Sequence, residues 1–112
     1  MTSAEFKCLR ESMGLTTKWL ADRWGVAEFS VKRWERDRML PAGFEEDMRD
    51  LKARFDREVA QAATTPEDSC IIVPRVDAEA PRGLPAAWFH AVAQRASEKS
   101  GARILFYGDE QL

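Results

Sequence analysis

The stretch that decides the fold is "LRESMGLTTKWLADRWGVAEFSVKRWERDRMLP", residues 9–41. Glycines and a proline divide it into three short segments in which apolar residues recur at helical spacing. Thr16 is suited to begin a helix as its N-cap, Gly25 is suited to end it, and Pro41 bars the next helix from continuing. A helix capped by Ser3 precedes this pair. The stretch therefore predicts two short helices joined by a tight turn.

The second helix of this pair is predicted from Glu28 to about Asp37. Val31 and Trp34 fall on its inner side. Its outward rows carry an acid, an aromatic ring and a basic cluster, namely Glu28, Phe29, Lys32, Arg33 and Arg36. The DNA major groove admits one helix. There an arginine can donate two hydrogen bonds to guanine, a glutamate can accept one from cytosine, and an aromatic ring can pack on the methyl group of thymine. Within the whole pattern, this face favours DNA contact over a solvated charged surface.

Residues 9–41 resemble the Cro/lambda-repressor type of helix-turn-helix regulator. The matches, in order, are Leu9-Arg10, Gly14-Leu15-Thr16, Leu20-Ala21, Gly25-Val26, Val31, Trp34-Glu35 and Pro41. The resemblance implies a sequence-specific DNA-binding domain. It also implies that Arg10 and Glu35 form a structural pair that ties the first helix to the end of the third.

The resemblance further implies which side chains meet DNA. The implied base contacts are Glu28, Phe29, Lys32 and Arg33. The implied contacts to the DNA backbone are Thr17, Lys18, Arg36 and Arg38. The chain departs from the family at Thr17, where glutamine is usual, and at Ala27, where the family prefers a capping Ser, Thr or Asn. The missing cap costs about 1 kcal/mol of helix stability.

Beyond Pro41 the chain is predicted to form one long helix and a small tail. The helix is predicted from Phe44 to Ala63, and its apolar stripe from Phe44 to Val59 packs either within one subunit or between two. The polar segment "TTPEDS", residues 64–69, is a linker. Strands are expected in "CIIVPRV" and "ARILFYG", with a loop and then a helix from Pro85 to Gly101 between them.

The expected fold class is thus mainly α or α+β. Residues 1–63 form a helix-turn-helix domain of four to five helices, residues 64–69 a linker, and residues 70–112 a β-α-β dimerisation region. Two strands and one helix bury too little surface to be stable alone, which favours pairing with a second copy.

The layout of the whole chain is also similar to a family of small bacterial and phage regulators that includes the anti-CRISPR-associated autorepressors. In that family the tail holds two subunits together. The residues expected at the dimer interface are Phe55, Val59, Ile72, Trp88, Val92, Leu105 and Phe106.

Composition limits the functional classes to which this protein can belong. The net charge of −2 argues against indiscriminate nucleic-acid coating, while residues 1–40 hold eight Lys/Arg against six Asp/Glu. Cys8 and Cys70 are expected as buried thiols, and with His90 they form no metal-binding spacing. No catalytic motif, cofactor, metal, small-molecule ligand or membrane segment is expected, so the sequence predicts a cytoplasmic non-enzyme.

Two functions remain open. The leading hypothesis is a homodimeric transcriptional repressor that binds double-stranded DNA at an inverted repeat, in its own promoter, and blocks polymerase by occlusion. The alternative is an antitoxin-like or other interaction module whose C-terminal region binds a partner protein.

Overall fold

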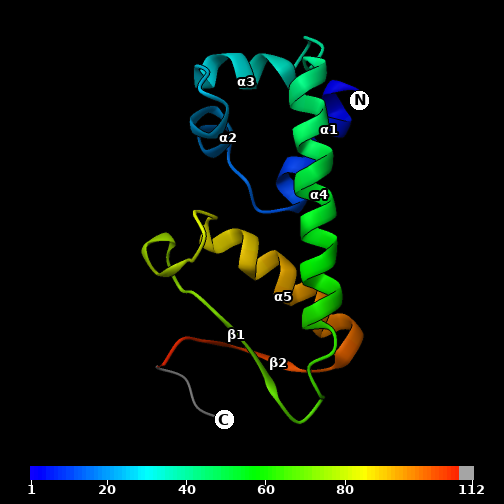
Figure 1. Ribbon diagram of the computed structural model, residues 1–112, viewed down its shortest axis with the longest axis vertical. Helices are drawn as coiled ribbons and strands as arrows, with labels where there is room; N and C mark the ends of the chain where they lie inside the picture. Colours follow the sequence, from blue (N-terminus) through cyan, green and yellow to red (C-terminus); the bar gives the residue numbers. More distant parts are fainter. Residues whose placement is uncertain (109–112) are drawn as a thin grey trace. The chain divides into compact units, whose positions relative to one another are not determined.

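The computed structural model describes residues 1–108 and confirms a mixed α+β fold with five α-helices and one small parallel sheet (Figure 1). The chain divides into two compact units, the first from Met1 to Ala53 and the second from Arg54 onward. The elements in order are α1 Ser3–Ser12, α2 Thr17–Trp24, α3 Glu28–Trp34, α4 Ala42–Ala62, β1 Cys70–Val73, the 3-10 turn η1 Asp77–Glu79, α5 Ala86–Ser100 and β2 Arg103–Phe106.

The first helix is capped one residue earlier than expected. Thr2, and not Ser3, is the N-cap of α1. Its hydroxyl accepts a hydrogen bond from the Glu5 N–H at 3.0 Å, and the Glu5 carboxylate accepts one from the Thr2 N–H at 2.7 Å. Glu5 lies three residues after Thr2, which is the spacing that a reciprocal capping pair requires. A cap at Ser3 would have placed Phe6 at that position.

The predicted bounds of α2 are confirmed. The Thr16 hydroxyl accepts from the Trp19 N–H at 3.0 Å, and Gly25 ends the helix in the left-handed conformation, with φ +65°. A residue with a side chain is strained at this φ, so the glycine permits the sharp turn into α3.

Helix α3 ends at Trp34, earlier than the predicted end at Asp37. The backbone carbonyl of Arg33 accepts from the N–H groups of Arg36, Asp37 and Arg38 at 3.0–3.1 Å. These bonds close a tight turn that replaces the last helical turn. At the other end, Ala27 provides no side-chain cap, as the sequence predicts.

An aromatic cluster connects the helices of the first unit. The Trp24 ring stacks on Phe44 with centroids 4.7 Å apart, and it lies 6.1 Å from the Phe6 ring. The Trp34 ring lies 5.3 Å from Phe44. The fully buried aliphatic side chains around this cluster are Met13, Leu15, Leu20, Val31, Met48 and Leu51. Together they form one core for α1, α2, α3 and the first half of α4.

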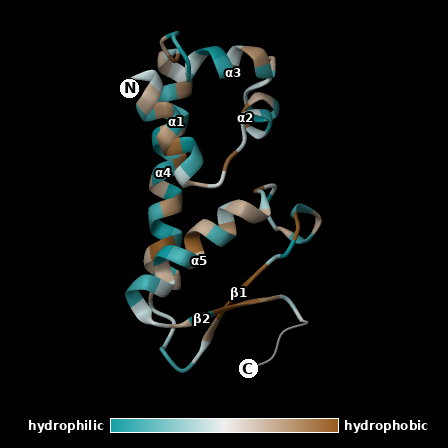
Figure 2. Cartoon of the chain, turned by 180° about the vertical axis from the view of Figure 1, so that it is seen from behind, coloured by the Kyte–Doolittle hydropathy of each residue, from teal (hydrophilic) through white to brown (hydrophobic). Residues whose placement is uncertain are grey.

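The second unit packs α5 and the end of α4 with the two strands. Strand β1 pairs with β2 in parallel, with Cys70 opposite Arg103 and Val73 opposite Phe106. Helix α5 contacts both strands, and β1 is continuously hydrophobic (Figure 2). The buried core contains Phe55, Val59, Val73, Leu84, Trp88, Val92, Ala93 and Ala96. The predicted β-α-β order of elements is therefore confirmed.

The loop between β1 and α5 holds a turn that the sequence analysis missed. The Glu79 carboxylate accepts from the N–H groups of Arg75 and Val76, at 3.0 and 3.3 Å, and closes η1. The Asp77 carboxylate accepts from the Ala86 N–H at 2.8 Å and so caps α5, whose preceding residue is Pro85. The Asp77 carboxylate thus replaces the side-chain cap that Pro85 cannot provide.

Two further findings concern surface chemistry. Within residues 1–108, no helix is long and apolar enough to cross a bilayer. The expectation that both thiols are buried is wrong for Cys8, which is exposed on α1, while Cys70 is half-buried on β1. The helical spacing around Leu9 does not turn Cys8 toward the core.

Candidate nucleic-acid interface

The inner side of α3 packs into the core of the first unit. Val31 is fully buried, and Trp34 is held in the aromatic cluster described above. Because α3 has only seven residues, these two contacts determine which side chains face outward. Phe29 and Lys32 are accordingly exposed, and Glu28 and Arg33 are half-buried.

Phe29 and Arg33 form a contact pair on the outward side of α3. The Phe29 side chain is 64 % exposed. The Arg33 guanidinium carbon lies 5.6 Å from the Phe29 ring centroid, a cation–π distance. The two residues are four apart and so lie in one row on the helix.

Thr17 and Glu28 connect the two helices of the pair. The Thr17 hydroxyl donates to Oε2 of Glu28 at 2.8 Å, so the first residue of α2 holds the first residue of α3. The sequence analysis assigned both residues to DNA but did not predict their contact. Their positions at the two helix starts are the only signal that would have suggested it.

Three cations near α3 carry an unbalanced charge. In the part of the chain that the structure describes, no carboxylate forms an ion pair with Lys32, Arg33 or Arg38. Lys18 pairs with Asp22 at 3.4 Å, and Arg36 pairs with Asp37 at 3.3 Å. Both pairs are well exposed, and such pairs are worth little.

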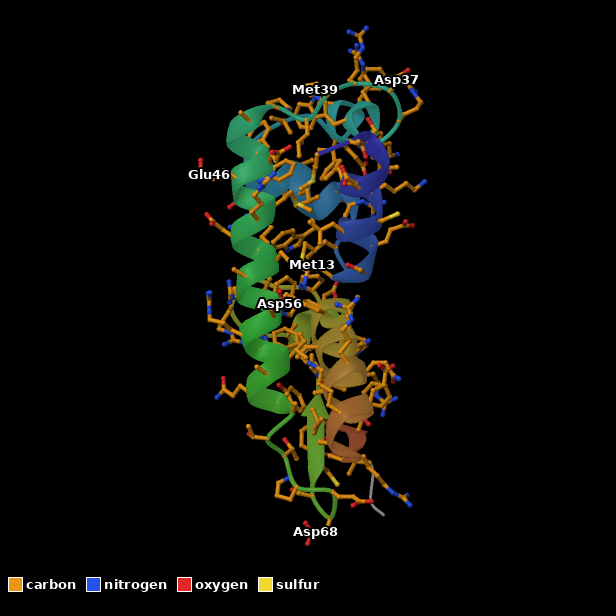
Figure 3. All side chains as sticks on the ribbon, turned by 90° about the vertical axis from the view of Figure 1, so that its right-hand side faces the viewer. Met13, Asp37, Met39, Glu46, Asp56 and Asp68 are labelled. Carbon is orange, nitrogen blue, oxygen red and sulfur yellow. The ribbon has the colours of Figure 1, made fainter. Side chains whose placement is uncertain are left out.

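An open hollow of about 360 Å³ lies beside the outer end of α3. Its lining residues are Ser30, Arg33, Trp34, Arg38 and Met39. Met39 is 86 % exposed in the loop that follows α3, where Figure 3 labels it near Asp37. The hollow thus places two unpaired guanidinium groups, a hydroxyl and exposed apolar surface together, which suits an anionic ligand with apolar parts.

A polar contact fixes α2 against the first half of α4. The Asp47 carboxylate accepts from Arg23 Nε at 2.7 Å and Nη2 at 3.1 Å, and from the Trp24 indole N–H at 2.7 Å. The Arg23 hydrogen bonds, helped by the Trp24 donor, hold the pKa of the Asp47 carboxyl below its ordinary value, against the opposing effect of partial burial. The contact therefore keeps Asp47 charged and α2 in place.

The residues expected at a dimer interface fall into two groups. Phe55, Val59, Trp88 and Val92 are 0–7 % exposed and belong to the core of the second unit itself. The remaining three are accessible on the sheet: Ile72 is exposed, and Leu105 and Phe106 are half-buried. The accessible members of this set therefore lie on the strands.

Both edges of the sheet are open within residues 1–108, since no third strand pairs with β1 or β2. The carbonyl of Val73 accepts from the Tyr107 N–H at 3.1 Å. In a parallel pair, backbone groups alternate between the partner strand and the outer edge, so the N–H and C=O of Ile72 point to the open edge of β1. A groove of about 510 Å³ adjoins this edge, between the end of α4 and α5.

The described residues hold no cluster of three or more His, Cys, Asp or Glu side chains arranged to bind a metal ion. Comparisons with protein-family models, with curated proteins and with solved structures found no match for this chain.

Proposed function

We propose that this protein is a helix-turn-helix transcriptional repressor that binds double-stranded DNA as a homodimer. The observation that carries the proposal is the outward face of α3, where an exposed Phe29 lies beside the unpaired cations Lys32 and Arg33. A solvated surface helix gains nothing from an exposed phenylalanine, whereas a helix in the major groove uses both groups.

The proposed contacts follow from the geometry of the two helices. Arg33 donates to guanine, Phe29 packs on a thymine methyl, and Glu28 accepts from cytosine. One Glu28 oxygen is held by Thr17, which leaves the other oxygen for the base. Lys18 at the start of α2, with Arg36 and Arg38 after α3, lies among exposed residues suited to backbone phosphates.

Dimerisation is supported by the unpaired sheet. Exposed apolar side chains at the strands and their ends are Ile72, Val76 and Tyr107, at 41–51 % exposure. Two copies joined through strand edges would cover surface that otherwise promotes aggregation. A twofold dimer would read two half-sites about 34 Å apart, which requires an inverted repeat. We place this repeat in the protein's own promoter, where a bound dimer would block polymerase.

Fluorescence anisotropy with the full chain tests the DNA-binding proposal. Duplexes from upstream of the gene should bind in the nanomolar range at low salt, and binding should weaken steeply as salt rises. Arg33→Ala should weaken the specific duplex more than a random one, whereas Arg38→Ala should weaken both equally. Arg57→Ala, an exposed cation of the second unit, is the matched control. Equal losses on both duplexes with Arg33→Ala would remove its base-reading role.

A second candidate function has one specific observation in its favour. The lining of the groove beside the open edge of β1 includes the apolar side chains Phe89, Val92 and Ala93 and the polar side chains Gln61 and Thr64. An extended segment of a partner protein would pair with the free backbone groups of Ile72 there. The anisotropy experiment also separates the two candidates, because the repressor must bind duplex DNA without a partner protein.

A further inference from the structure

We propose that Phe29 and Arg33 act as one two-part reader of a thymine followed by a guanine on the same strand, and that they accept 5-methylcytosine in place of the thymine. This inference rests on the proposed function. It adds the DNA base step that the protein reads and the DNA modification that it accepts. It starts from the pairing of two side chains that the DNA proposal otherwise treats as separate contacts.

The pair is already arranged before any DNA is bound. Arg33 lies 5.6 Å from the Phe29 ring centroid, and no carboxylate in residues 1–108 competes for its guanidinium group. A planar guanidinium held by an aromatic ring loses less freedom when it forms a two-point hydrogen bond. Val31 and Trp34 anchor the backbone between and after them, so the pair moves with a fixed helix.

The spacing of the pair fits two neighbouring base pairs. Successive base pairs are about 3.4 Å apart, so 5.6 Å lies between one step and two. A guanidinium that donates to guanine N7 and O6 lies nearly in the plane of that base. The Phe29 ring is then beside the preceding base, at the depth where a pyrimidine C5-methyl group projects into the major groove.

The chemistry selects the preceding base. An exposed phenylalanine gains from covering a methyl group and gains nothing from the polar edges of adenine or guanine. Thymine and 5-methylcytosine carry that methyl group, and unmodified cytosine does not. A pyrimidine followed by a purine is also a deformable step, which lets a bulky ring approach. Binding should therefore respond to cytosine methylation at CG steps.

The experiment uses the full chain and removes one methyl group at a time. A randomised 20-base-pair duplex library is selected on the wild-type protein, and the enriched sites should contain the TG step. Anisotropy then compares the selected duplex with one that carries uracil in place of that thymine. Loss of a single buried methyl group should weaken binding about fourfold. A duplex with methylated CG at this step should bind about fourfold tighter than its unmethylated form.

Two variants make the test specific. Phe29→Ala should abolish the uracil effect and the methylation effect, bringing both ratios to about one. Because Phe29 is 64 % exposed, this variant retains its folded core. Lys32→Ala is the matched control: it removes a neighbouring exposed cation and lowers affinity, but both fourfold ratios should persist.

The outcomes separate this inference from the function on which it rests. Enriched sites without a TG step, or a wild-type protein that does not distinguish thymine from uracil, overturn the two-part reader and leave DNA binding intact. A protein that retains no duplex from the library overturns the proposed function itself.

Discussion

Arg10 and Glu35 form a two-point ion pair between α1 and the residue that follows α3. Arg10 Nε donates to Oε2 at 2.8 Å and Nη2 donates to Oε1 at 3.3 Å, with both side chains little more than a tenth exposed. Arg10 Nη1 also donates to the backbone carbonyl of Leu15 at 2.8 Å. One guanidinium thus fixes the end of α3 and the turn before α2.

Arg10→Met should destabilise the first unit by about 2–3 kcal/mol, because it leaves the Glu35 charge largely buried without a partner. The double variant Arg10→Met/Glu35→Leu should lose less, since it removes both charges. Urea unfolding of the full chain measures the difference. Arg36→Ala, which breaks an exposed pair with Asp37, serves as control and should change stability by less than about 0.5 kcal/mol. Equal losses for Arg10→Met and Arg36→Ala would contradict this account.

Asp47 should make stability depend on acid pH. Its folded pKa lies below the unfolded value of 3.8 because Arg23 and Trp24 donate to the charged carboxylate. The stabilisation is therefore complete above that value and is lost as pH falls through the lower, folded pKa. In thermal unfolding, the stability of Asp47→Asn should fall less steeply with decreasing pH than the stability of the wild type. Part of the stability loss at acid pH should remain in this variant, because two other carboxyl groups also have lowered pKa values. Glu5 is hydrogen-bonded to Thr2, and Glu45 is hydrogen-bonded to the Met1 amino group.

Ala27→Ser should stabilise the protein by about 1 kcal/mol. Ala27 is exposed, has extended backbone angles of φ −70° and ψ 142°, and precedes α3 without a capping side chain. A serine hydroxyl there would accept from a free N–H of the first helical turn. Thr16→Ala, which removes the existing cap of α2, should cause a loss of similar size. An unchanged urea midpoint for Ala27→Ser would show that α3 gains nothing from a cap.

Trp88→Phe should destabilise the second unit by about 1–2 kcal/mol, and Trp88→Ala by about 3–5 kcal/mol. The Trp88 indole is fully buried, donates to Glu58 Oε1 at 2.9 Å and meets the Phe55 ring edge-on at 5.1 Å. Phenylalanine keeps an aromatic ring near Phe55, but it removes the hydrogen-bond donor and leaves a small void because phenyl is smaller than indole. Circular dichroism should be used in place of tryptophan fluorescence. The three tryptophans that remain in these variants lie in the first unit, so their fluorescence would not report on the second. Similar losses for both variants would show that the hydrogen bond dominates.

Thr17→Val should lower discrimination for cytosine at one position of the selected site. The hydroxyl holds the Glu28 carboxylate in one orientation, and valine removes that donor at nearly constant volume. A mobile carboxylate should discriminate about three- to tenfold less well, measured by competition between duplexes that differ at that base pair. Thr17→Ser retains the donor and should behave as wild type. A change in overall affinity without a change in preference would assign Thr17 to the DNA backbone instead.

Local signals in the sequence located most helix ends. Thr16, Gly25 and Gly101 act through their own backbone angles or side chains, and each marks an observed boundary. The end of α3 was misplaced because it depends on the Arg33 carbonyl, which accepts three N–H groups in a turn that no residue type announces. The turn η1 was missed because Glu79 and Asp77 act there through their side chains.

The site was only partly predictable for a similar reason. Helical periodicity places Phe29, Lys32 and Arg33 outward; in the structure Phe29 and Lys32 are exposed and Arg33 is half-buried. Periodicity also marks Trp88 and Val92 as apolar but carries no information on which surface covers them. In the structure, both side chains are buried within the second unit itself. Contacts between distant side chains, such as Asp47 with Arg23 and Trp24, depend on tertiary packing that the pattern of one chain does not encode.

The parallel pairing of β1 with β2 also determines when the second unit can fold during synthesis. Strand β1 has no partner until all of α5 and then β2 have been translated, because the register places Cys70 opposite Arg103. At roughly 5–20 residues per second, the ribosome needs on the order of seconds to bridge that interval. The first unit ends at Ala53, so all of it is translated before β2 and has time to fold before then. Until then, Ile71–Val73 is an apolar strand without its partner, and unpaired strands of this kind promote aggregation.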